Sequence, residues 1–71
     1  MDENLIEAIR TRYQADMKDA FAKIGIELNN PTKNSAEEIR HLVSFFSRTK
    51  ENASYFEAIV KNLKGEDTDE Q

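Results

Sequence analysis

Residues 39–63, IRHLVSFFSRTKENASYFEAIVKNL, decide the fold of this chain. Positions separated alternately by three and four residues form one seam along this stretch: Ile39, Leu42, Phe46, Thr49, Ala53, Phe56, Val60 and Leu63. All of them except Thr49 are apolar. A repeat of 3.5 residues keeps one face of a helix against a partner helix along its whole length. The seam therefore predicts helix packing, and it specifies no substrate or cofactor.

The flanks of this seam differ in composition. One flank carries Phe45 and Ile59 with Asn52 between them, and the other carries Val43, Lys50, Glu57 and Lys64. The apolar stripe therefore covers about three-sevenths of the helix surface, which is typical of a bundle and wider than a two-stranded coiled-coil seam. The pattern predicts an all-α helical bundle.

The number of helices in the second half of the chain depends on the polar segment 47–52. Ser35 and Glu38 form a capping-box pattern, which predicts that a helix starts at Ala36. Two alternatives follow: a helical hairpin with one long second helix, 36–64, or three helices with a break near 47–53. We favour the long helix because the polar segment has neither Gly nor Pro and the seam resumes in phase beyond it. Gly65 then ends the helix.

The first half of the chain also has helical periodicity. Its apolar face comprises Ile6, Ile9, Tyr13, Met17, Ala20 and Ile24. Gly25 offers a left-handed C-cap, so we expect this helix to end near Ile24, with Ile26 and Leu28 attaching the following turn to the core. A helix of about 32 Å would then face one of about 43 Å, and the longer helix would extend beyond its partner.

Length and composition limit what this chain of 71 residues forms. A chain this small buries only about 60% of its unfolded surface, and without cysteine it has no disulfide or thiolate zinc site to stabilise it. We expect one helical domain, 1–65, completed by dimerisation. Residues 66–71 contain no apolar side chain and are predicted to form a disordered acidic tail.

The N-terminal segment predicts a cytoplasmic protein. Asp2 and Glu3 are acidic where a signal peptide would be basic, and no apolar run approaches the roughly 20 residues that cross a bilayer. We therefore expect no membrane association.

Residues that support catalysis or metal binding are few. His41 is the only histidine and follows Glu37 by four residues, which is too small a set for a metal site. The chain has two glycines and no glycine-rich phosphate loop, and its serines have no base and orienting partner arranged nearby in the sequence. The sequence predicts no enzyme activity, cofactor or metal.

We therefore expect a small non-enzymatic protein–protein interaction module, such as an adaptor, an accessory subunit or a regulator or inhibitor of another protein. The predicted interface comprises Leu42, Phe45, Phe46, Phe56 and Ile59, with Tyr55 as an aromatic anchor. The expected partners are a second copy of the chain and another protein. Because 14 acidic residues outnumber 10 basic ones, a basic surface is the predicted feature of that other protein.

The alternative is a small dimeric DNA-associated regulatory protein. Dimerisation would then bring together Arg10, Arg12, Arg40 and Arg48 from two chains. The acidic excess argues against nucleic acid as a partner, because such binding needs a basic stripe that neutralises several phosphates.

Overall fold

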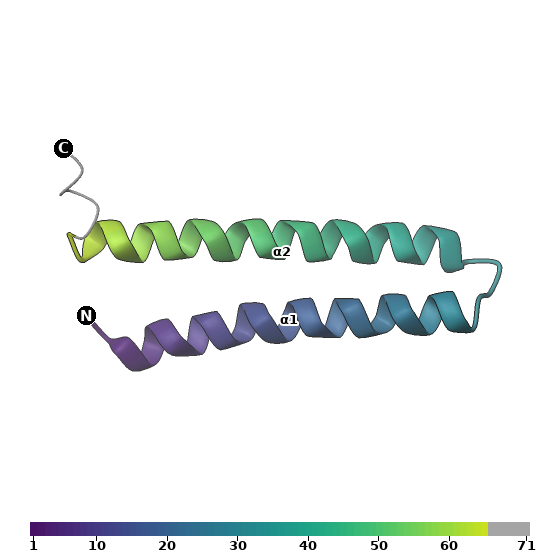
Figure 1. Cartoon of the computed structure of the whole chain (residues 1–71), viewed down its shortest axis with the longest axis horizontal. Helices are drawn as coiled ribbons and strands as arrows, with labels where there is room; N and C mark the ends of the chain where they lie inside the picture. The colour runs from purple at the N-terminus through teal and green to yellow at the C-terminus, as the bar shows by residue number, and fades with distance from the viewer. Residues whose placement is uncertain (66–71) are drawn as a thin grey trace.

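Two antiparallel helices form the protein in a computed structural model, which describes residues 1–65 (Figure 1). Helix α1 spans Glu3–Asn29 and helix α2 spans Ser35–Leu63. The shortest axis measures 12 Å, about the diameter of one helix, so the hairpin is a single layer with two broad faces. The predicted all-α hairpin is confirmed. The predicted tail, 66–71, lies outside the described residues.

Helix α2 is continuous through the polar segment 47–52, so the long-helix alternative is confirmed and the three-helix one is wrong. Thr49, the polar member of the seam, is buried between the helices. Seven of the eight seam positions are buried or half-buried, whereas Leu63 at the end of the helix is exposed. The heptad pattern therefore identifies the face of α2 that packs on α1.

The start of α2 differs from the predicted capping box. Asn34 occupies the N-cap position without a side-chain cap bond, and Ser35 is already helical. The Ser35 hydroxyl instead accepts a hydrogen bond from the Thr32 N–H and donates one of 2.6 Å to Glu27 Oε1 of α1. The prediction was wrong because this hydroxyl joins the two helices across the turn.

Helix α1 continues through Gly25 to Asn29, so the predicted end near Ile24 is wrong. A helical Gly costs only about 1 kcal/mol, which tertiary packing readily outweighs. Asn30 ends the helix because a residue that precedes proline, here Pro31, disfavours helical geometry. Gly65 has a φ of +81° and follows α2 as predicted.

The longer α1 changes the shape of the hairpin. With 27 and 29 residues, or about 40 and 43 Å, the helices are nearly equal in length, so the expected extension of one beyond the other is wrong. The side chains of Ile26 and Leu28 are exposed rather than attached to the core, so neither belongs to the packed face of α1.

The core of this single layer is thin. Among the described residues only three apolar side chains are buried, namely Ile6, Ala20 and Val60, and no large side chain is completely buried. Two helices enclose a side chain from two directions only. Much of the apolar surface of the hairpin therefore remains exposed on its two broad faces.

Candidate interaction surfaces

The ion pairs between the helices define one broad face of the hairpin. Arg10 contacts Glu57, and Glu3 contacts Lys64. Residues seven positions apart share a helix flank. Glu7, which pairs with Arg10, therefore shares a flank of α1 with Gln14, Phe21 and Leu28, and Glu57 and Lys64 share a flank of α2 with Val43 and Lys50. We call this surface the groove face.

The opposite surface is formed by the other two flanks. Its central columns contain Ile9, Asp16 and Lys23 of α1, and Phe45, Asn52 and Ile59 of α2. Leu5, Ile26 and Tyr55 border these columns, because each lies three or four residues from one of their members. We call this surface the apolar face.

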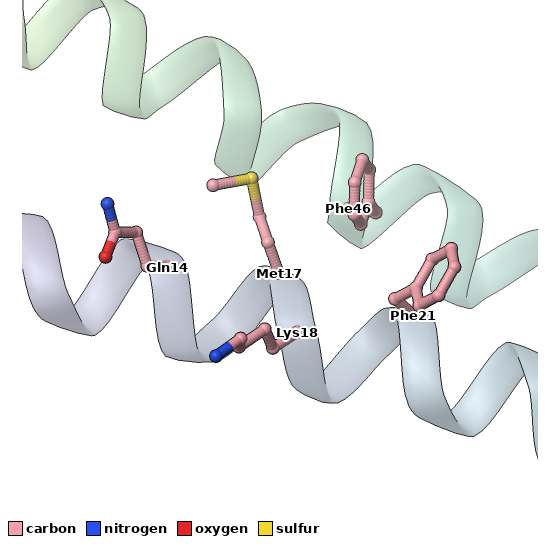
Figure 2. Close-up of a pocket in the computed structure, with 5 residues that line it drawn as sticks. All are labelled: Gln14, Met17, Lys18, Phe21 and Phe46. Atoms are coloured by element: carbon pink, nitrogen blue, oxygen red, sulfur yellow. The ribbon is translucent and has the colours of Figure 1, made fainter.

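The groove face is hollowed between the helices. A hollow of about 430 Å³ is lined by Gln14, Met17, Lys18, Phe21 and Phe46 (Figure 2). A second hollow of about 270 Å³ shares Gln14 and Met17 with the first and extends to Lys50 and Glu57. The two hollows therefore form one groove along the hairpin, apolar toward the turn and polar toward the termini.

The polar end of this groove is closed by a charged cluster. Arg10 Nε and Nη2 donate to the two Glu57 carboxylate oxygens at 2.7 and 2.9 Å, and Arg10 Nη1 lies 3.2 Å from Glu7 Oε1. The hydrogen bonds from Arg10 lower the pKa of Glu57, and those same bonds to Glu57 and Glu7 raise the pKa of Arg10. Arg10 and Glu57 therefore both remain charged, and their opposite charges neutralise each other.

The groove has a positive rim, with one lysine lining each hollow. Lys18 of α1 lines the first hollow and Lys50 of α2 lines the second, and neither forms an ion pair with any residue in 1–65. Both ammonium groups are thus available to carboxylates from outside the chain.

Large side chains dominate the apolar face. Phe45 and Ile59 are 43% and 54% exposed, and Leu5 and Tyr55 are more exposed still. The central charges of this face form pairs along α1, where Asp16 contacts Arg12 and Lys23 contacts Asp19. This surface is therefore both apolar and close to electrically balanced.

The six predicted interface residues fall into two groups. Leu42, Phe46 and Phe56 are half-buried on the seam, and the Phe56 ring packs edge-on against Tyr13 with 6.1 Å between ring centroids. The other three, Phe45, Tyr55 and Ile59, are exposed on the apolar face and its border. Sequence reasoning did not assign Phe21 to an interface, although its 72% exposure makes it the most exposed aromatic ring described.

The four arginines of the DNA-binding alternative lie apart in the single chain. Arg10 and Arg12 are two residues apart on α1, so they point to different sides of the helix, and both form ion pairs. Arg40 and Arg48 lie on α2 and have no ion pair within residues 1–65. One hairpin therefore presents no patch that includes all four.

The part of the chain that the structure describes has neither a metal-binding cluster nor a membrane-spanning helix. Within residues 1–65, no group of three or more His, Cys, Asp or Glu side chains is arranged to hold a metal ion. In the same range, neither helix is long and apolar enough to cross a membrane. Comparisons with protein families, curated proteins and solved structures find no match to this chain.

Proposed function

We propose that the protein is a small non-enzymatic interaction module of the cytoplasm, an adaptor, accessory subunit or regulator that self-associates through its apolar face. One observation supports this most strongly: Phe45 and Ile59 are exposed on one flank of α2, about 21 Å apart, in a hairpin that buries only three apolar residues within the described range. A second layer of helices against this face would remove these side chains from water, at about 25 cal/mol per Å² of apolar area.

The size of the face suits a dimer. A helix of about 43 Å and a two-helix width of about 19 Å give roughly 800 Å² per copy. Stable protein–protein interfaces bury about 800 Å² on each partner. A twofold dimer places the same surface on both copies, and such self-pairing needs balanced charge. On this face the charge of Asp16 is balanced by Arg12 and that of Lys23 by Asp19.

Sedimentation equilibrium of the full chain tests this proposal. We expect the mass to rise toward twice the 8.2 kDa of the chain between low and high micromolar concentration. A monomer that persists at high micromolar concentration would contradict self-association.

The predicted partner with a basic surface depends on the end of the chain. Residues 1–65 contain ten acidic and ten basic residues, so the net charge of −4 comes from Glu66, Asp67, Asp69 and Glu70. We propose that this segment attracts the basic partner by long-range electrostatics. Retention on a DNA column at low salt distinguishes the DNA-associated alternative, and our proposal expects the protein in the flow-through.

A further inference from the structure

We infer that the groove face is a second binding site, which takes an acidic amphipathic helix from another protein. This inference goes beyond self-association, because it concerns the opposite surface of the hairpin and different residues. It depends on two features of the groove: an apolar floor and a positive rim without internal partners.

The floor fits apolar side chains from a helix. Met17 extends from α1 toward α2, and the rings of Phe21 and Phe46 lie beside the same hollow (Figure 2). Its volume of about 430 Å³ falls within the roughly 300–1,000 Å³ of ligand pockets, and methionine adapts readily to incoming shapes. The groove runs along the hairpin, so it matches the row of anchors that one helix presents at i, i+3, i+4 and i+7.

The rim determines the charge of the occupant. Lys18 and Lys50 line the groove from different helices, and no carboxylate in residues 1–65 pairs with either. Arg10, at the polar end, is already neutralised by Glu57 and Glu7. Carboxylates on both sides of an apolar stripe would therefore meet two unpaired ammonium groups.

A second copy of the chain fits this face poorly. In a twofold dimer, residues near the symmetry axis meet their own copies, and Lys18 and Lys50 lie near the middle of their helices. An axis through the middle of the groove face would therefore bring the lysines of the two copies close together. Like charges across an interface oppose association. The groove face therefore favours a different partner, whereas the balanced apolar face favours self-association.

Two matched peptides test the inference against the full chain. Each has about 18 residues with leucines at i, i+3, i+4 and i+7, flanked by glutamates in one peptide and by lysines in the other. Fluorescence anisotropy should show the acidic peptide binding at least about tenfold more tightly than the basic one. No binding of the acidic peptide, or equal affinity for both, would overturn the inference.

Variants of the protein locate the binding. Phe21→Ser should weaken binding of the acidic peptide about tenfold or more, since aromatic anchors contribute most at interfaces. The double variant Lys18→Glu, Lys50→Glu should reverse the preference between the peptides. The matched control is Lys33→Glu, which changes an unpaired lysine in the turn, away from the groove.

The inference fails if the double variant binds both peptides as Lys33→Glu does, or if Phe21→Ser binds normally. Circular dichroism checks that each variant keeps its helices, which we expect because Phe21 is largely exposed. Sedimentation of the wild-type chain does not involve these peptides. A negative peptide-binding result would therefore leave the proposal of self-association untouched. A monomer in sedimentation would likewise leave the inference about the groove face untouched.

Discussion

The two broad faces of the hairpin share one seam but differ in chemistry. On α2, the flank of the apolar face carries Phe45, Asn52 and Ile59, whereas the flank of the groove face carries Val43, Lys50 and Glu57. The seam determines that two helices pack, and the flanks determine the chemistry that each face presents. In a layer one helix thick, both flanks reach the surface.

The ion pairs reinforce this difference. Both pairs that cross between the helices within residues 1–65, Arg10 with Glu57 and Glu3 with Lys64, lie on the groove face. The pairs on the apolar face, such as Asp16 with Arg12, lie within one helix. The groove face thus contributes ion pairs that join the two helices, and the apolar face retains exposed apolar area.

The largest effect is expected from breaking the seam beneath both faces. Ile6→Ala removes a buried side chain and should lower the free energy of unfolding by about 2–4 kcal/mol, a large share of the stability of so small a domain. Urea denaturation followed by circular dichroism measures the loss. The control, Phe21→Ala, truncates an exposed side chain and should change stability by less than about 1 kcal/mol. Equal losses would show that the assignment of buried and exposed positions is wrong.

The next effect separates the faces. Phe45→Glu combined with Ile59→Glu should raise the dimer dissociation constant at least about thirtyfold, because two carboxylates replace apolar side chains in the interface. Sedimentation equilibrium measures the change. Phe21→Glu, on the groove face, should dimerise like the wild type. If Phe21→Glu dissociates the dimer and the double variant does not, the faces have been assigned the wrong way round.

A smaller effect is expected where the helices meet at the turn. Ser35→Ala removes a buried hydroxyl that bonds both Thr32 and Glu27, and should cost about 1–2 kcal/mol in unfolding free energy. Ser44→Ala, at an exposed position of the same helix, is the matched control and should cost little. A loss no greater than in Ser44→Ala would mean that the hydroxyl bonds add nothing to the hairpin.

The smallest effect is a pH dependence confined to the groove face. Arg10 lowers the pKa of Glu57 below the ordinary 4.5, so the folded state binds this proton less readily than the unfolded state. The resulting stability is present above about pH 4.5 and is lost as the pH falls through the lowered pKa. Thermal melting at pH 7 and pH 3 should show a smaller acid loss in Glu57→Gln than in the wild type. Glu51→Gln, at an exposed carboxylate outside the ion pairs described, should lose as much as the wild type.

The sequence predicted those parts of the fold that depend on local pattern. The spacing from Ile39 to Val60 identified the packed face of α2, because a heptad repeat is visible in one segment alone. The end of α1 was not predictable in this way, since packing against α2 decided whether Gly25 stopped the helix. Ser35 was misassigned for a similar reason, because its partner Glu27 belongs to the other helix.

The candidate surfaces were predictable to different degrees. Phe45 and Ile59 were identified as a flank because they lie in one column of one helix. The groove was not identified, because it needs the antiparallel register that brings Phe21 beside Phe46. Their separation in sequence gives no signal that they line one hollow. One pattern would have indicated the groove. It is a column of apolar flank residues on each helix, with the two columns aligned in antiparallel order.

Thiol labelling of two single-cysteine variants tests most directly whether the apolar face joins two copies, because the chain has no cysteine of its own. Asn52→Cys places a thiol at the middle of the apolar face, and Gln14→Cys places one on the groove face. Both parent residues are exposed in the single hairpin. As concentration rises from low to high micromolar, labelling at position 52 should slow at least about tenfold while labelling at position 14 stays constant. Unchanged labelling at position 52, or slowing at position 14 alone, would contradict self-association through the apolar face.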